Sequence, residues 1–177
     1  SMVNDYPIIN WSERPARTEL IKYPMAGDKS HHVRVGVFNT ATESTIWLKT
    51  GIPVEQYLTN IAWSPDDTRF YFCDTPERHL RVYDYDAPSG AISNRRLFAD
   101  LGADPGNPDG GTVDCEGYVW NAQWDGWRLV RYAPDGTVDL VIMLPVQKPT
   151  SVMFGGADLR TLFVTSAVWD LEAEALA

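Results

Sequence analysis

Short strand-like segments recur between turn signals along most of this chain. Two successive rounds hold four segments each: residues 58–63, 69–73, 80–85 and 96–99, then residues 112–115, 118–122, 128–132 and 138–143. Two more segments, 151–154 and 161–165, begin a third round. Equivalent first strands, near Asn60, Asp109 and Thr150, lie about 40–50 residues apart, the period of β-propeller blades. A β-sandwich is the alternative, but it does not explain why the same cycle of strands and turns returns.

The repeat predicts an all-β protein with four-stranded, propeller-type blades, about three of them in one chain. An earlier, partial round is expected in residues 17–23, 33–39 and 45–49. Three blades do not readily close a ring, and an open propeller leaves flat blade faces and unpaired strand edges exposed. We therefore expect self-association, with a homodimer favoured, in which a second copy completes the ring.

Charge and hydropathy restrict the other partners. The formal net charge of −9 and the pI near 4.7 oppose phosphate backbones and anionic lipid surfaces, so neither nucleic acid nor membrane is expected. No apolar run approaches the ~20 residues of a membrane-spanning helix, and no leader opens the chain. We expect a soluble protein of unknown compartment, with Ser1-Met2 left by tag removal. Cys73 and Cys115 are predicted to be buried thiols rather than a disulfide.

Several segments between residues 60 and 169 resemble one known family. They are "NIAWSPDDTRFYFCDTP", "VYDYDAPSGAISNRRLFAD", "NPDGGTVDCEGYVWNAQWDGWRLVRYAPDG", "LPVQKPTSVMFGG" and "TLFVTSA". In this order and spacing they resemble the senescence-marker-protein, gluconolactonase and regucalcin family of six-bladed propellers. The resemblance covers the middle and later part of such a propeller.

A second resemblance covers residues 3–66. "VNDYPIIN", "IKYPMAGDKSHHVRVGVFNTATESTIWLKTG" and "EQYLTNIAWSPDD" are similar to the eight-bladed propeller domain of bacterial dipeptidyl peptidase IV. Because "NIAWSPD" fits both families, it is a natural splice point, and we expect an engineered or recombined chimera. The expected organisation is an N-terminal segment (1–16), a peptidase-like partial blade (17–66), lactonase-like blades (67–169) and a helix-prone tail (170–177).

The lactonase resemblance implies a divalent cation, commonly calcium, at the mouth of the central channel, where it polarises a sugar lactone and positions a water. The family's ligands are a Glu from the first blade, an Asn that begins an inner strand and an Asp in a P-D-G turn. Asn60 matches the Asn, and Asp109 matches the Asp, which is also the family's expected catalytic base. Such oxygen ligands suit calcium or magnesium rather than zinc. No residue of this chain matches the Glu.

Three functions follow from these patterns. We favour a chimera that folds and self-associates without an intact active site, because one carboxylate and one amide fall short of the 6–8 oxygens that calcium takes. The alternatives are a calcium-dependent sugar lactonase with a partial site at Asn60 and Asp109, and a propeller that binds a small ligand. Both residues also have a purely structural interpretation, as a strand cap and a turn residue. Peptidase activity is not expected, since the chain has no G-x-S-x-G motif.

Overall fold

The computed structural model describes residues 2–25, 27–51 and 60–169. The chain divides into two compact units, the first built on residues 1–36 and the second on residues 37–49 together with the chain from residue 60 on. The predicted helix-prone tail and the start of the predicted strand 58–63 lie outside the described residues.

The first unit contains one antiparallel hairpin, formed by β1 (Asp5–Asn10) and β2 (Arg17–Lys22). Ile, Tyr and Thr side chains favour extended backbone here. Asp5 lies opposite Lys22 in the register, and their side chains form an ion pair of 2.7 Å. We predicted from the sequence that the β2 segment belongs to a partial blade. In the structure it pairs with β1, which supplies its backbone hydrogen bonds.

The second unit begins with another hairpin, β3 (Gly36–Asn39) and β4 (Ser44–Trp47). The side chain of Asn39 accepts hydrogen bonds from the backbone N–H groups of Ala41 and Thr42, which closes the turn between the strands. Hydrogen bonds from nearby backbone N–H groups to the side chain are the reason that Asn is common at the start of turns. The segments predicted to share one partial blade therefore lie in two separate hairpins.

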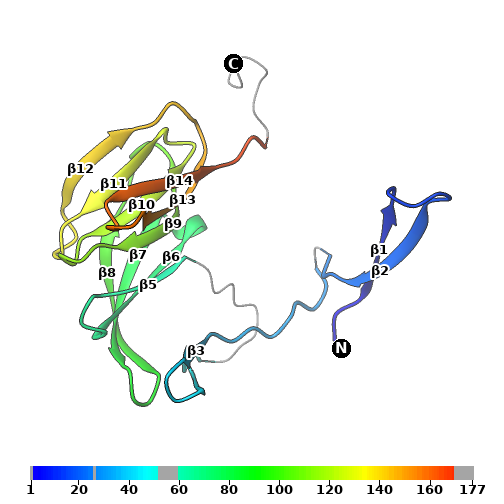
Figure 1. Ribbon diagram of the computed structural model, residues 1–177, viewed down its shortest axis with the longest axis horizontal. Coiled ribbons are helices and arrows are strands. Elements are labelled where there is room, and N and C mark those ends of the chain that lie inside the picture. The colour runs from blue at the N-terminus through cyan, green and yellow to red at the C-terminus, as the bar shows by residue number, and fades with distance from the viewer. Residues whose placement is uncertain (1, 26, 52–59, 170–177) are drawn as a thin grey trace. The chain divides into compact units, whose positions relative to one another are not determined.

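Two four-stranded antiparallel sheets follow, and each runs through its strands in sequence order. The first sheet consists of β5 (Ile61–Trp63), β6 (Arg69–Asp74), β7 (His79–Asp86) and β8 (Ala91–Asp100), with a 3-10 turn, η1 (Thr75–Glu77), after β6. The second consists of β9 (Asn107–Val113), β10 (Val119–Trp124), β11 (Arg128–Tyr132) and β12 (Val138–Met143). The last two strands, β13 (Pro149–Gly155) and β14 (Thr161–Ser166), pair as a hairpin (Figure 1).

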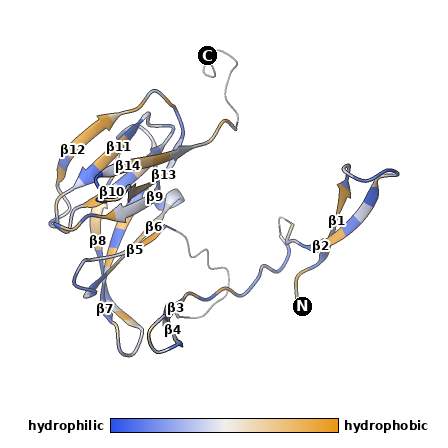
Figure 2. Ribbon diagram, viewed as in Figure 1, coloured by the Kyte–Doolittle hydropathy of each residue, from blue (hydrophilic) through white to orange (hydrophobic). Residues whose placement is uncertain are grey.

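Hydrophobic residues lie mainly on the strands of these sheets, and hydrophilic residues on the turns between them (Figure 2). One buried cluster joins the two four-stranded sheets and includes Tyr71 and Phe98 from the first and Tyr132 from the second. A second cluster joins β10 and β11 to the β13–β14 hairpin through Trp120, Leu129 and Val152, with Phe154 against the Trp120 ring at 5.7 Å. Face-to-face packing of successive four-stranded sheets is the propeller arrangement, so the predicted fold class is confirmed.

The cysteines differ from their prediction in one respect. Cys73 is buried in the cluster between the sheets, at 3% exposure. Cys115 is exposed in the turn before β10, which corrects the prediction that both are buried. Asp114 Oδ1 accepts hydrogen bonds from the backbone N–H groups of both Glu116 and Tyr118. These bonds hold the turn, and Cys115 with it, at the surface. Neither cysteine forms a disulfide. Within the described ranges, no helix has the length and apolar character needed to cross a membrane.

Candidate functional site

Asn60 precedes β5 and has a positive backbone angle, φ 54°. This left-handed conformation is uncommon for most residues, but asparagine tolerates it because its short side chain bonds locally. The conformation turns the chain as it enters the inner strand of the first sheet. The side chain of Asn60 is thereby placed at the end of β5 that faces the second sheet.

Asp109 lies on β9, the first strand of the second sheet, within a β-bulge. Asn121 of β10 pairs with Gly111, and Gln123 pairs with Pro108, so Asp109 and Gly110 together lie opposite a single residue of β10. A bulge of this kind bends its strand and re-aims a side chain, and such bulges are common beside active sites. The sequence prediction placed this strand at residues 112–115, whereas it runs from Asn107 to Val113.

Two glycines make the bulge possible. A Cβ on Gly110 would lie 2.5 Å from Ser151 Oγ and 2.7 Å from the carbonyl oxygen of Thr150, both in β13. A Cβ on Gly111 would lie 2.5 Å from the carbonyl oxygen of Trp120 in β10. These distances are shorter than a real Cβ contact allows. The P-D-G-G sequence therefore combines the acidic residue with the two small residues that let neighbouring backbones approach it.

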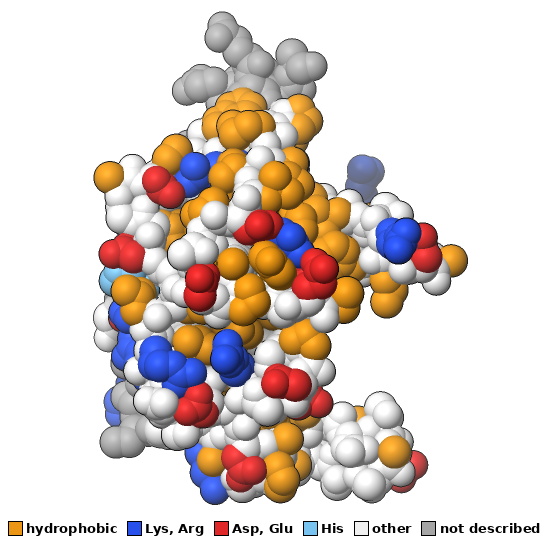
Figure 3. Space-filling view, turned by 90° about the vertical axis from the view of Figure 1, so that its left-hand side faces the viewer, with side chains coloured by type: hydrophobic (Ala, Val, Ile, Leu, Met, Phe, Trp, Pro, Cys, Tyr) orange, Lys and Arg blue, Asp and Glu red, His pale blue; other side chains and the backbone are white. Residues whose placement is uncertain are grey.

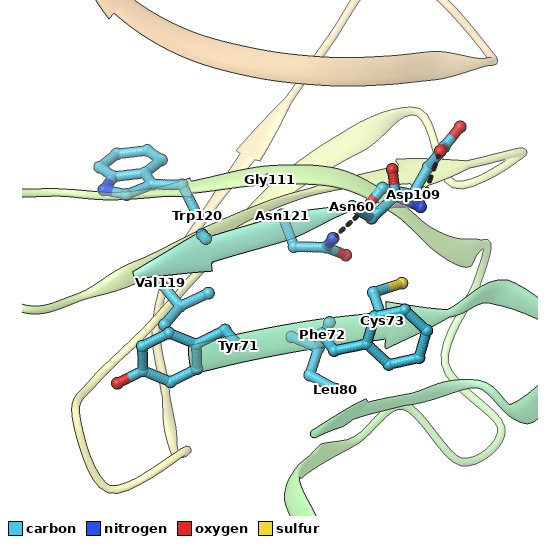
Figure 4. Close-up of a pocket in the computed structure, with 11 residues that line it drawn as sticks. Asn60, Tyr71, Phe72, Cys73, Leu80, Asp109, Gly111, Val119, Trp120 and Asn121 are labelled. Atoms are coloured by element: carbon cyan, nitrogen blue, oxygen red, sulfur yellow. Dashed lines mark hydrogen bonds between the residues drawn. The ribbon is translucent and has the colours of Figure 1, made fainter. Parts of the chain in front are cut away.

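The structure brings the two residues predicted from sequence together. Asn60 Nδ2 lies 3.5 Å from Asp109 Oδ1, although 49 positions separate the residues in sequence (Figure 4). This distance is the long limit of a hydrogen bond. The two side chains are therefore neighbours, and no strong hydrogen bond between them engages their oxygen atoms.

Burial raises the pKa of the Asp109 carboxyl above its usual range, because a partly desolvated carboxylate is disfavoured relative to the neutral acid. Hydrogen bonds from the Gly110 N–H and from Asn60 oppose this shift without cancelling it. A raised carboxyl pKa at a concave site is a feature of groups that accept protons near neutral pH.

A small cavity of about 20 Å³ adjoins the pair, enough for a single water molecule. Asn60, Asp109 and Asn121 supply its polar lining, and the remaining wall comes mainly from Tyr71, Leu80 and Trp120 (Figure 4). The sequence prediction missed Asn121. Its only signal was a polar residue inside the apolar strand segment "YVWNA".

The donor chemistry of the pair suits a hard cation. Carboxylate and amide oxygens are typical calcium and magnesium ligands, and calcium takes about 6–8 of them. Asn60 and Asp109 supply only part of such a shell, and the described residues contain no group of three or more His, Cys, Asp or Glu that could hold a metal. The pair thus fits one side of a calcium-type site.

Comparison with known proteins identifies the family. The model of the SMP-30/gluconolactonase/LRE-like region matches residues 54–168, which is more than half of the chain. The chain belongs to this family. The β5–β14 region, with both Asn60 and Asp109, lies within the match.

Curated relatives of this SMP-30/gluconolactonase-like chain include lactonases. A pentonolactonase of Haloferax volcanii is 39% identical over 140 residues, or 78% of this chain and 47% of the relative. An L-arabinolactonase of Azospirillum brasilense is 38% identical over 143 residues, or 81% of this chain and 47% of the relative. Regucalcin of Danio rerio is 40% identical over 65% of this chain and 39% of the relative. The chain spans about half the length of the curated relatives it matches.

Solved structures show the same relationship. A calcium-binding protein, regucalcin, from Agrobacterium tumefaciens superimposes with a TM-score of 0.66 at 32% identity, over 76% of this chain and 45% of that structure. A luciferin-regenerating enzyme superimposes with a TM-score of 0.65, also at 32% identity, over 75% of this chain and 44% of that structure.

The chimera prediction is wrong. The arabinolactonase alignment takes in 81% of the chain, so it includes residues before position 40, inside the segment that the sequence prediction assigned to a peptidase. A putative dipeptidyl aminopeptidase IV from Bacteroides ovatus has a TM-score of 0.50 at 20% identity over 95% of this chain and 29% of that structure, which shows the fold alone. The misleading signal has a physical origin, because all propellers share short strands and the same turn chemistry.

Proposed function

We propose that this chain is part of a divalent-cation-dependent sugar lactonase, with Asp109 as the catalytic base. The observation that carries the proposal is that Asn60, which precedes β5, lies 3.5 Å from Asp109 in the β9 bulge, in a chain that belongs to the gluconolactonase-like family. This function replaces the inactive chimera, which the natural lactonase relatives contradict.

The reaction requires one proton to be taken up and returned. Water adds its oxygen to the lactone carbonyl, the ring carbon–oxygen bond breaks, and the product is a hydroxy acid. Asp109 would accept the proton from the water and deliver it to the departing ring oxygen. Burial alone raises the pKa of Asp109, whereas the charge of a bound cation would favour the carboxylate, the form that accepts a proton in general base catalysis.

The cation side of the proposal rests on the same two residues. Asn60 and Asp109 would hold the cation through their side-chain oxygens, which are hard donors of the kind calcium prefers. A bound cation would supply a positive charge that polarises the lactone carbonyl. The cavity beside the pair has room for one water, and its wall is largely apolar.

The substrate class follows from the relatives. Their names describe action on pentonolactones, L-arabinolactone and 6-deoxy-6-sulfogluconolactone, which are all polyhydroxylated lactones. We infer a five- or six-carbon sugar lactone for this chain. Because calcium takes about 6–8 oxygen ligands, the site needs further oxygen donors beyond Asn60 and Asp109.

An assay of acid release tests the proposal. The purified chain is mixed with arabinonolactone or gluconolactone in the presence of calcium, magnesium, manganese or a chelator, and a pH indicator follows the hydroxy acid. We expect cation-dependent hydrolysis above the spontaneous rate, reduced about 100-fold or more in Asp109→Asn and unchanged in Asp67→Asn, an exposed turn residue. Rates equal to those in buffer, with every lactone and cation, would contradict the proposal.

A further inference from the structure

Asn121 is a buried amide beside the candidate site. It lies on β10 with 2% of its surface exposed. Its Nδ2 donates a hydrogen bond of 2.7 Å to the main-chain oxygen of Asp109 (Figure 4). A carbonyl oxygen only accepts hydrogen bonds, so the amide nitrogen faces Asp109 and the amide oxygen points away from it.

The β-bulge explains why Asp109 needs this donor. Asp109 and Gly110 lie opposite a single residue of β10, so the regular ladder of backbone hydrogen bonds is interrupted between Asn121 and Gln123. A buried carbonyl without a donor is costly, and a side chain must replace the missing ladder bond. Asn121 supplies that bond and ties β10 to the backbone of Asp109 itself.

The other end of the same amide indicates that packing alone does not explain the residue. Asn121 Oδ1 is buried and has no hydrogen-bond partner among the described residues. Asn121 also lines the cavity of about 20 Å³ that it shares with Asn60 and Asp109. An apolar side chain of similar size would fill this position without leaving a buried acceptor unpaired. The hydrogen bond that Asn121 Nδ2 donates therefore explains an amide at this position, although the amide oxygen is left without a partner among the described residues.

We propose that Asn121 is a positioning residue, which holds the β9 bulge so that the Asp109 carboxylate faces Asn60. This inference rests on the proposed function, because it concerns the same site. Asn121 acts on the backbone of Asp109, and no role in binding the cation itself is assigned to it. Supporting residues of this kind typically change metal affinity by about 10–100-fold when they are replaced.

The test compares Asn121→Val with Tyr132→Phe. The first variant removes the donor to Asp109 and keeps a compact side chain at position 121. The second removes the Tyr132 hydroxyl on β11, which accepts a hydrogen bond of 3.0 Å from Nε2 of Gln123, a residue that borders the bulge. It leaves the Asn121 bond to the Asp109 backbone in place, so it matches the first as a loss of one buried hydrogen bond. Asn121→Ala is used if Asn121→Val does not fold.

Calcium affinity by calorimetry is the first measurement, and amide hydrogen exchange in the absence of metal is the second. We expect Asn121→Val to weaken calcium binding about 10–100-fold and to speed exchange about 10-fold or more at Asp109, Gly110 and Gly111, compared with β11. Tyr132→Phe should leave calcium affinity within about twofold of the original chain. Unchanged affinity in Asn121→Val would overturn the inference.

The two measurements separate this inference from the proposed function. If the original chain binds no calcium, the proposed function fails, and hydrogen exchange alone decides the role of Asn121. Faster exchange confined to residues 109–111 in Asn121→Val, and absent in Tyr132→Phe, would then support the positioning role. Exchange at these amides equal to that of the original chain would overturn it.

Discussion

Asn60 Nδ2 lies 3.5 Å from Asp109 Oδ1, across the join between two successive sheets. The relationship follows from the fold, because β5 and β9 are the first strands of their sheets and lie beside each other. This arrangement brings Asn60, which precedes β5, to the side of Asp109 in the β9 bulge. A family that places an amide on one strand and a carboxylate on the next therefore builds an oxygen-rich site without a long loop.

The first prediction concerns the stability cost of Asp109. Burial raises the pKa of this carboxyl, so the folded state favours the neutral acid, and stability is lost as the pH rises through the raised pKa. Asp109→Asn carries no charge at any pH. We expect the variant to have a higher thermal midpoint than the original chain at pH 7, and the same midpoint at about pH 3, where both side chains are neutral.

Circular dichroism at the two pH values measures this difference. Asp67→Asn is the matched control, since Asp67 is exposed in a turn and has a backbone angle, φ 55°, that asparagine also adopts. The control should change the midpoint little at either pH. A destabilised Asp109→Asn at pH 7 would show that the carboxylate is stabilised by its surroundings, contrary to this account.

The sequence predicted most of the sheet order, because alternating apolar residues and polar turns determine strands locally. Residues 128–132 were predicted as a strand and are β11. The predicted boundaries of β9 lay too late in the sequence, because Pro108, Gly110 and Gly111 have low strand propensity. β13 packs closely against Gly110, and β10 against Gly111. Such tertiary contacts cannot be read from local composition.

The candidate site was predictable in part. The motif match identified Asn60 and Asp109, and the structure places them together. Asn121 could not be predicted, because an alternating pattern assigns a side chain to a face of the sheet without revealing which backbone oxygen it meets. Residues 5–10 were likewise left out of any strand, since their pairing with β2 depends on a turn whose length the pattern does not specify.

The second prediction concerns the close approach at Gly110. A Cβ there would meet Ser151 Oγ at 2.5 Å and the Thr150 carbonyl at 2.7 Å, and the backbone oxygen cannot move aside without shifting β13. We expect Gly110→Ala to destabilise the chain by about 1–3 kcal/mol and to weaken calcium binding, because it displaces Asp109. Chemical denaturation and calorimetry measure the two effects.

Gly117→Ala is the control for this substitution. Gly117 has φ +86°, and its nearest neighbour to a new Cβ is Pro134 Cγ at 3.7 Å, so alanine costs only about 1–2 kcal/mol for the left-handed conformation. It should therefore destabilise the chain without affecting calcium affinity. Equal calcium binding in both variants would show that β13 does not hold the bulge in place.

The third prediction concerns Asp114, which receives hydrogen bonds of 2.9 Å from Trp120 Nε1 and 2.8 Å from Arg131. Burial raises the pKa of Asp114, but these hydrogen bonds and the charge of Arg131 lower it by more, so the net shift is downward. Stability from this carboxylate is present above its ordinary pKa and lost as the pH falls through the lowered value. We expect Asp114→Asn to cost about 1.5–3 kcal/mol at pH 7.

Urea denaturation at pH 7 and at about pH 2 checks this prediction. The loss should shrink at the lower pH, because a growing fraction of Asp114 in the original chain becomes protonated as the pH falls towards its lowered pKa. Glu116→Gln provides the comparison, because Glu116 pairs with the same Arg131 but its side chain is 67% exposed. Such an exposed pair contributes about 0–1 kcal/mol. Equal losses in the two variants would refute a special role for Asp114.

The fourth prediction concerns self-association. Met153 and Phe163 lie opposite each other in the β13–β14 hairpin, and their side chains are 58% and 57% exposed. The hairpin has two strands, whereas the β5–β8 and β9–β12 sheets before it have four each. On the side of the unit that carries β12, further hydrophobic side chains also lie at the surface (Figure 3). Exposed apolar faces and unpaired strand edges favour association.

We therefore predict that a second copy of the chain covers the Met153–Phe163 face, and that sedimentation equilibrium gives the mass of a dimer. Phe163→Glu should shift the chain towards the monomer, because a buried glutamate without a partner opposes association. Leu159→Glu, at an exposed turn position of 65% exposure, should leave the mass unchanged. A monomeric original chain at high concentration would reject the prediction, whereas equal weakening by both variants would indicate a different face.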